Sequence, residues 1–195
     1  MAAPKRVVTV DQRTLVEQAG QGDHDAFAVL ARAAFARLDT AARLILRDAE
    51  LARDAVQEAM VRAWRDLPGL RDPERFDAWL YRLTVNACLD AARHRRRRVR
   101  EVELTPMTDV HIPDRSGLLA DRDQLDHALR LLEPDLRAIV VLHYYLDLTL
   151  PETADALRLP VGTIKSRLHR ALTALRVTVA ADEVASPPEP EGRYA

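Results

Sequence analysis

The 195-residue sequence is poor in the residues that build cross-linked, zinc-bound or membrane-spanning structure. Its single cysteine, Cys88, excludes an intramolecular disulfide framework and any multi-cysteine zinc site. No apolar run approaches the ~18 residues needed to span a bilayer, and residues 1–12 lack the apolar core of a signal peptide. We therefore expect a soluble, cytoplasmic protein without membrane insertion, in which Cys88 packs inside a helical core.

The sequence also lacks the patterns that mark common catalytic and cofactor sites. It has no Gly-rich phosphate loop, no nucleophile elbow and no paired-carboxylate constellation. None of its six histidines stands at metal-ligand spacing from Cys, Asp or Glu. These absences favour a binding protein without catalytic residues, metal or cofactor. A helical enzyme that uses scattered His and Asp is the alternative from another class, and no spacing supports it.

Glycine and aromatic residues are scarce too, which favours a fold built only from helices. There are 6 glycines and 5% aromatic residues, with few β-branched runs. The 48% hydrophobic content is sufficient for real cores, and the length allows one or two domains. The net charge of −1 says nothing about nucleic acid, but cations cluster near 93–100 and along 158–176.

Residues 148–176 have the pattern of two short helices joined by a tight turn. Thr149 and Glu152 have the spacing of a capping box, so we expect a helix to begin at Leu150. Pro160 disfavours the helical conformation at the residue before it, and a second helix is expected from about Val161. The apolar stripe of this second helix consists of Ile164, Leu168, Ala171, Leu172 and Leu175.

The opposite face of the second helix carries short, polar and cationic side chains. These residues are Gly162, Lys165, Ser166, His169, Arg170 and Thr173. A recognition helix in the DNA major groove needs donors for base edges and charges for phosphates, and this face supplies both. From this stretch alone, an ordinary helical hairpin with a solvated cationic face is the alternative.

The first half of the chain contains further helical patterns separated by breaks. The segment 20–23 is interpreted as a helix break with Asp23 as the N-cap of the next helix. A helical period covers 43–66, the segment 68–76 has the composition of a loop, and 77–98 is helical again. The core stripe expected in the last of these helices is Leu80, Leu83, Ala87 and Ala91.

Two of these helices have polar faces that are candidates for binding a partner. The residues of 43–66 that lie away from its apolar positions are Asp54, Gln57, Glu58, Arg62 and Arg65, and the functional interpretation of this face is a docking surface for a protein partner. A solvated charged face is the alternative. In 77–98, a face with an aromatic group, an amide and cations suits unpaired bases, although a half-buried packing role is the alternative for its aromatic residue. That face consists of Trp79, Arg82, Asn86 and Arg93.

Six arginines lie within eight positions at the end of the same helix. They are Arg93, Arg95, Arg96, Arg97, Arg98 and Arg100. Such a density of positive charge repels itself unless an anion is nearby, so a phosphate backbone is the expected partner. A solvated, flexible end of the helix is the alternative.

The patterns divide the chain into two helical domains, 11–98 and 121–178. Between them, 99–120 is expected to be a flexible linker, because it contains Pro, Ser-Gly and no clear period. The segment 179–195, Pro- and Glu-rich at its end, is expected to be a disordered tail. Two helices before the opening helix pair should supply its apolar support, marked by Leu125, Leu129, Leu132, Leu136, Ile139, Val140 and His143.

Four stretches in this order resemble extracytoplasmic-function (ECF) sigma factors, the small sigma subunits of bacterial RNA polymerase. They are GDHDAF (22–27), RDAVQEAMVRAW (53–64), WLYRLTVNACLDAAR (79–93) and PVGTIKSRLHRA (160–171). The resemblance covers about 11–176. It implies an all-α fold with a sigma region 2-like bundle and a sigma region 4-like helix-turn-helix. A helix-turn-helix regulator that acts without core polymerase is the alternative, and it does not explain 79–98.

The resemblance also implies partners and roles. The first domain is expected to bind core RNA polymerase through Asp54, Gln57 and Glu58. Strand opening at the minus-ten element is expected to use a flipped non-template base, with DNA contacts from Arg71 in the 71–76 loop and from Trp79, Arg82, Asn86, Arg93, Arg95, Arg96 and Arg97. The second domain is expected to read the minus-thirty-five element through Lys165, Ser166, His169 and Arg170. The linker should pass near the polymerase active-site and RNA-exit channels, and an anti-sigma factor is a further expected partner.

One residue departs from the family pattern. Many relatives have glycine where this chain has Arg158, at the end of the first helix of the pair. Glycine adopts the left-handed conformation without steric cost, whereas arginine would lose on the order of 1 kcal/mol in it. The geometry of the turn is therefore the point at which this chain is expected to differ.

Overall fold

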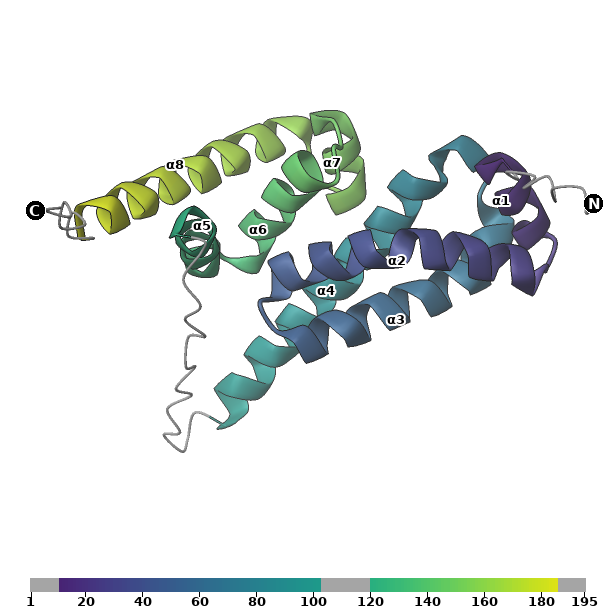
Figure 1. Cartoon of the computed structure of the whole chain (residues 1–195), viewed down its shortest axis with the longest axis horizontal. Helices are drawn as coiled ribbons and strands as arrows, with labels where there is room; N and C mark the ends of the chain where they lie inside the picture. The colour runs from purple at the N-terminus through teal and green to yellow at the C-terminus, as the bar shows by residue number, and fades with distance from the viewer. Residues whose placement is uncertain (1–10, 103–119, 186–195) are drawn as a thin grey trace, which may run out of the picture.

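The computed structural model describes residues 11–102 and 120–185, and the regular structure within them is helical (Figure 1). The first unit contains α1 (Gln12–Gly20), α2 (His24–Leu46), α3 (Ala49–Asp66), the 3₁₀ turns η1 (Leu67–Gly69) and η2 (Pro73–Arg75), and α4 (Phe76–Val102). The second unit contains α5 (Ala120–Leu131), α6 (Pro134–Val140), the π-helical turn η3 (Val141–Tyr145), α7 (Leu150–Leu157) and α8 (Val161–Ala185). The predicted all-α class is confirmed. No helix in the two described stretches is long and apolar enough to cross a lipid bilayer.

An aspartate side chain sets the start of α2. Asp23 accepts hydrogen bonds from the backbone N–H groups of Asp25, at 2.9 Å, and Ala26, at 3.1 Å. These bonds satisfy two donors that have no partner within the helix. The preceding Gly22 has a φ of +96°, which L side chains rarely adopt. The predicted helix break and the Asp23 cap are confirmed.

A second aspartate divides the segment 43–66, for which the helical period predicted one helix. Asp48 accepts from the backbone N–H groups of Glu50 and Leu51, both at 3.0 Å, and begins α3. Just before it, Arg47 has a left-handed φ of 57° and ends α2. The expectation of one helix is wrong, because a left-handed arginine carries no glycine or proline signal in the sequence.

The segment 68–76, expected to be a loop, contains the two 3₁₀ turns instead. Asp72 accepts from a backbone N–H of η2 at 3.1 Å and so caps that turn. Phe76 is the first residue of α4, and its side chain is buried. These turns fix where α4 begins, and with it the direction in which Trp79 and Arg82 project.

The first unit packs around buried side chains from α2, α3 and α4. The α4 stripe is buried at Leu80 and Ala87, while Leu83 and Ala91 are partly buried. Cys88 lies in the same core, where burial raises the pKa of its thiol to about 12. The thiol therefore stays protonated, and its predicted packing role is confirmed.

The second unit is held together by the predicted stripe of α8. Its buried members are Ile164, Leu168, Ala171 and Leu175, with Leu172 partly buried. They pack against Leu129 and Leu132 near α5 and against Ile139 of α6. The prediction that Leu125 lies in the core is wrong, because its side chain is 49% exposed. Ala128 is buried in this part of α5.

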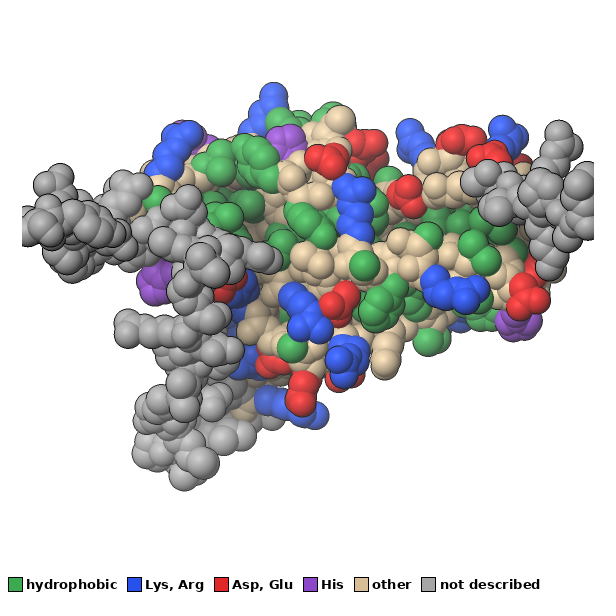
Figure 2. All heavy atoms as spheres, viewed as in Figure 1, with side chains coloured by type: hydrophobic (Ala, Val, Ile, Leu, Met, Phe, Trp, Pro, Cys, Tyr) green, Lys and Arg blue, Asp and Glu red, His purple; other side chains and the backbone are tan. Residues whose placement is uncertain are grey.

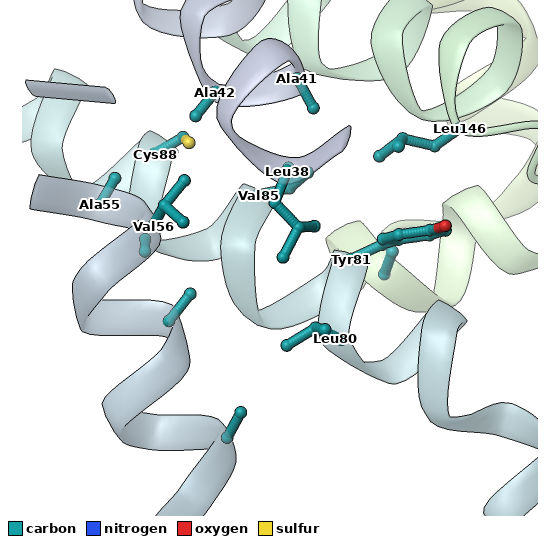
Figure 3. Close-up of a cluster of buried hydrophobic side chains, with 14 of the residues drawn as sticks. Leu38, Ala41, Ala42, Ala55, Val56, Leu80, Tyr81, Val85, Cys88 and Leu146 are labelled. Atoms are coloured by element: carbon teal, nitrogen blue, oxygen red, sulfur yellow. The ribbon is translucent and has the colours of Figure 1, made fainter. Parts of the chain in front are cut away.

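The two units share a buried seam. Helix α6 packs against α2 and α4, and α7 packs against α4. Figure 3 shows Leu146, which follows η3, pointing into the cluster that contains Tyr81, Leu38 and Val85. The second unit therefore completes part of the first unit's core, and the chain adopts a closed arrangement.

Two expected boundaries need correction. Helix α4 continues past Arg98 to Val102, beyond the expected start of the linker at 99, and α5 begins at Ala120. Helix α8 continues to Ala185, so the first part of the expected disordered tail 179–195 is helical. The rest of the expected linker and tail, and the segment before residue 11, lie outside the described residues.

Candidate nucleic-acid and polymerase interfaces

The capping box predicted at the start of α7 is confirmed. The Glu152 backbone N–H donates to Thr149 Oγ1 at 3.3 Å, and the Thr149 N–H donates to Glu152 Oε2 at 2.8 Å. The Thr149 hydroxyl also donates to that carboxylate, at 2.6 Å. These bonds, the hydroxyl's first, lower the pKa of Glu152 below its usual value. They fix the start of the first helix of the predicted pair.

The turn between α7 and α8 has the conformation expected from the family's glycine. Arg158 has φ 54° and ψ 44°, in the left-handed region. The Leu159 N–H donates to the Ala154 carbonyl at 3.0 Å, and α8 begins directly after Pro160. The turn is formed without glycine, and Arg158 carries a conformational cost on the order of 1 kcal/mol.

The face of α8 opposite its buried stripe is open to solvent. Lys165, Ser166, His169 and Arg170 are all exposed. Ser166 Oγ donates to the Thr163 carbonyl at 3.0 Å, so this hydroxyl is turned toward its own helix. The other three side chains are available for base edges or phosphates. The arrangement is that of a helix anchored on one side and free to contact a groove on the other.

The face of α4 is less accessible. Trp79, Arg82 and Asn86 are half-buried, and the Trp79 ring lies 6.0 Å from the Phe76 ring at a tilt of 43°. Trp79 also packs against the main core, which fits the alternative packing role. Packing and base stacking are compatible, because one ring face or edge can be buried while the remainder stays accessible.

A pocket of about 180 Å³ lies where α4 meets α7. From the first unit it is lined by Arg75, Trp79 and Arg82, and from α7 by Glu152 and Asp155. Arg71, the expected contact in the 71–76 segment, is exposed and does not line this pocket. Arg75 was not among the predicted site residues, and the 3₁₀ turn η2 places it in the same pocket lining as Trp79.

The arginine run at the end of α4 is partly neutralised by the chain's own carboxylates. Arg93 pairs with Asp90 at 2.9 Å, and Arg95 pairs with Asp48 at 3.3 Å. Arg96 pairs with Glu133, across the seam between the units. Arg97 and Arg98 are exposed. The anions that such a density of charge requires are therefore supplied, in the closed arrangement, by protein as well as by solvent.

The candidate polymerase-binding residues form one exposed strip on α3. Asp54, Gln57 and Glu58 are all exposed, on the side of the helix away from Val56. Val61, one turn further along, is 67% exposed and adds an apolar group to the strip. Helical spacing brings 54, 57, 58 and 61 onto one side of the helix. The signal for Val61 in the sequence was therefore its spacing from these three polar residues.

Charges of both signs are mixed over the molecular face shown in Figure 2. Acidic and basic side chains lie beside one another there, in keeping with the net charge of −1. Among the residues that the structure describes, no group of three or more His, Cys, Asp or Glu side chains is placed to hold a metal ion. The candidate surfaces are thus defined by local faces of α3, α4 and α8.

Comparison with protein families matches a separate family model to each of the two helical units. Residues 30–98 match the model of sigma-70 region 2, and residues 122–175 match that of sigma-70 region 4. The fold and these two matches define a helical, two-region protein of the sigma-70 class.

Individual relatives narrow the class. The chain is 36% identical to the RNA polymerase sigma-E factor of Streptomyces avermitilis over 135 residues, which are 69% of this chain and 74% of the relative. It is 36% identical to the ECF RNA polymerase sigma factor SigM of Mycobacterium tuberculosis over 155 residues, 79% of this chain and 77% of the relative. The chain belongs to the family of ECF RNA polymerase sigma factors.

Two solved structures with a similar fold are complexes. CnrH, in complex with the cytosolic domain of CnrY, matches with a TM-score of 0.64 and 30% identity, over 88% of this chain and 98% of that chain. The sigma factor RpoE from Bartonella quintana, in complex with the anti-sigma factor NepR, matches with a TM-score of 0.63 and 25% identity. That match covers 79% of this chain and 94% of the other.

Proposed function

We propose that this chain binds core RNA polymerase through α3, reads promoter DNA through α4 and α8, and promotes strand opening at the start of transcription. The observation that carries the proposal is the pairing of a region 2 match over 30–98 with a region 4 match over 122–175 in one chain. A regulator that acts on duplex DNA alone needs the second region but has no use for the first. The proposed role is one of binding, without catalysis by the chain itself, and the proposed location is the cytoplasm, where such a role would be carried out.

The polymerase surface we assign is the α3 strip of Asp54, Gln57 and Glu58. Its support is exposure, shared orientation and the neighbouring exposed Val61, since interfaces combine a small apolar centre with a polar rim. Helix α3 packs mainly against α2 and α4, and the three side chains are exposed while the two units are packed together. Polymerase can therefore reach the strip in the closed arrangement as well as in an open one.

The minus-ten surface we assign is the α4 face with Trp79, Arg82 and Asn86, together with Arg71, Arg93 and Arg95 to Arg97. An aromatic ring next to guanidiniums can stack an unpaired base and hold the adjoining phosphates. Base stacking on an aromatic side chain contributes about 1–3 kcal/mol, which offsets the few kcal/mol needed to flip a base from the duplex. Trp79 is half-buried, so part of the ring is accessible for such a contact.

The minus-thirty-five surface we assign is the α8 face with Lys165, Ser166, His169 and Arg170. Arg170 is the candidate for a bidentate contact to guanine, and Lys165 for a phosphate or a single base acceptor. We further propose an anti-sigma factor as a partner. Its support is the similarity of this fold to RpoE, whose solved structure is a complex with the anti-sigma factor NepR.

The test is run-off transcription with core polymerase on a randomised promoter library. We expect enrichment of templates that share two elements, and co-elution of the chain with core polymerase. A variant with Asp54→Lys and Glu58→Lys should lose most of both. Glu17→Lys is the control, because Glu17, like Glu58, makes an i,i+4 ion pair with an arginine on an exposed helix face. Transcription that does not need the chain would contradict the proposal, and unchanged co-elution of the α3 variant would contradict the surface.

A further inference from the structure

The seam between the units places acidic groups opposite the α4 face. Glu152 and Asp155 of α7 line the same pocket as Trp79, Arg75 and Arg82. Arg75 lies near enough to Glu152 to contribute to the lowering of its pKa, after the Thr149 bonds. Carboxylates facing guanidiniums and an indole ring occupy the kind of place that phosphates and a base would take.

Several contacts hold α7 and its neighbours against the first unit. Arg37 of α2 donates to Asp147 Oδ2 at 3.0 Å and to the Tyr145 carbonyl at 3.2 Å, and its guanidinium stands 5.6 Å from the centre of the Tyr81 ring. Glu133 pairs across the seam with Arg96 of the arginine run. Beneath these polar contacts lies the shared apolar cluster that contains Leu146.

The seam also contains a group that opposes closure. Arg137 of α6 is 7% exposed, and its Nε, like that of Arg47, has no hydrogen-bond partner among the described residues. Burial, with Arg47 and Arg96 nearby, lowers the pKa of Arg137 to about 10. A buried cation without a full set of partners costs free energy that is recovered when water reaches it. Closure is thus held by some contacts and weakened by another, which is the balance a reversible state needs.

We propose that the second unit is an intramolecular competitor of promoter DNA for the α4 face, so that the seam must open before the minus-ten strand can bind. The inference rests on the proposed assignment of the α4 face to DNA. The distance between the two promoter elements also indicates that the units must separate. Elements near minus ten and minus thirty-five are about 25 base pairs apart, or ~85 Å at ~3.4 Å per base pair. Units packed directly on each other do not span that distance, whereas the segment 103–119 can reach ~55 Å when extended, at ~3.3 Å per residue.

The proposed competition affects the α4 face and not the α8 face. The α8 face is exposed in the closed arrangement, so duplex DNA can reach it without opening the seam. The α4 face is half-buried and covered in part by α7. By thermodynamic linkage, a ligand that binds only the open state must itself favour opening, whereas a ligand that binds both states alike leaves the equilibrium unchanged.

The test measures the distance between the units in the free full chain with paired spin labels at Arg53→Cys on α3 and Ala174→Cys on α8. Both positions are exposed, and the native Cys88 is buried, so it will not take the label. The seam variant is Arg37→Gln with Glu133→Gln. Its matched control, Arg32→Gln with Asp135→Asn, removes the same charges from α2 and α6 at exposed positions. Both pairs leave the net charge unchanged.

We expect one short distance in the parent chain and in the control. The seam variant should raise the ratio of open to closed chains about three- to tenfold, since it removes two exposed ion-pair contacts. A saturating single-stranded oligonucleotide with the non-template minus-ten sequence of a selected promoter should lengthen the distance in all three proteins. A minus-thirty-five duplex should not. The single variant Asp147→Asn, which keeps a side chain that tolerates the left-handed φ of 59°, should shift the ratio in the same direction.

Three results would overturn the inference: separated units in the parent chain, equal distances in the seam variant and the control, or a distance that saturating oligonucleotide leaves unchanged. Failure of the proposed function would be distinguishable from failure of this inference. In that case the chain would not support transcription with core polymerase, even though the distances between the units behave as expected.

Discussion

Two helix faces of this protein carry side chains suited to DNA, and they are presented in different ways. The α8 face rises from a helix whose other side is buried, and its four candidate residues are exposed. The α4 face is half-buried, shares a pocket with α7, and adjoins arginines already paired with carboxylates. One candidate DNA-binding face is therefore exposed and the other is partly covered. Side-chain type alone does not determine whether such a face is accessible to DNA.

The difference follows from where each helix finds its apolar partners. Helix α8 packs mainly against α5, α6 and α7 of its own unit, and Leu44 of α2 adds one partly buried side chain from the first unit to its apolar cluster. Helix α4 packs against α2 and α3, and also against α6 and α7 of the second unit. Its outer face therefore becomes part of the seam. Opening the seam exposes apolar surface as well as the candidate DNA contacts, which is why the closed form is stable without a partner.

The largest effect should come from breaking the anchor of the α8 face. Leu168→Asp buries a carboxylate among apolar side chains and should destabilise the second unit by at least about 3 kcal/mol. Thermal unfolding followed by circular dichroism measures it. Val177→Asp, on the same helix but 66% exposed, is the control and should change the stability little. Equal losses in the two variants would mean that α8 is not anchored by its stripe.

A smaller effect should separate base reading from phosphate binding on α8. Arg170→Ala should weaken duplex binding by about 1–3 kcal/mol and relax the preference at one base pair. Arg176→Ala, also exposed on α8, should not change that preference. The measurement is the affinity of the full chain for a panel of single-base promoter variants. A uniform loss over the panel for Arg170→Ala would make this residue a phosphate contact instead.

A change of about 1 kcal/mol should follow from relieving the turn before α8. Arg158→Gly should stabilise the protein by roughly that amount, because glycine has no steric cost in the left-handed region. Arg47→Gly provides the comparison. Arg47 has nearly the same φ, but its side chain pairs with Asp126, so the conformational gain is offset by a lost ion pair. Denaturant unfolding of both variants should show a gain only at 158, and no gain there would mean that the turn stores no strain.

The smallest effect concerns the pH dependence of α7, the helix that faces α4. The lowered pKa of Glu152 means that its capping contacts stabilise the folded state above the unfolded value of 4.5. This contribution is lost as the pH falls through the lower, folded pKa. It should amount to less than about 1 kcal/mol, because the carboxylate is largely exposed. Unfolding between pH 3 and 6 should depend less on pH in Glu152→Gln than in the parent, with Asp155→Asn as a control on the same helix. Equal pH dependence in parent and Glu152→Gln would contradict the capping role.

Periodicity was sufficient to predict the α8 face, and much of its setting. The spacing of Ile164 and Leu168 defines the buried side, so the orientation of Lys165 and Arg170 follows from helix geometry. The capping box at Thr149 and Glu152 is a local pattern of the same kind. Such features depend on residues three or four apart, which a sequence shows directly.

The seam could not be predicted in that way. Arg37 meets Asp147 across 110 positions of sequence, and no local pattern pairs them. The breaks at Arg47 and η2 depend on left-handed or 3₁₀ conformations of ordinary residues, without the glycine that marks the break at 20–23. The role of Arg75 beside Trp79 depends in turn on η2. Non-local packing decides these contacts, and with them the accessibility of the α4 face.

The most direct test of the contrast between the two faces is a pair of affinities measured on the free full chain. One is for the single-stranded minus-ten oligonucleotide and the other for the minus-thirty-five duplex, each compared between the parent, the seam variant Arg37→Gln with Glu133→Gln, and its matched control. We expect the seam variant to bind the single strand about three- to tenfold more tightly, in step with its open fraction, while its affinity for the duplex is unchanged. Equal changes in both affinities, or no gain for the single strand, would contradict it.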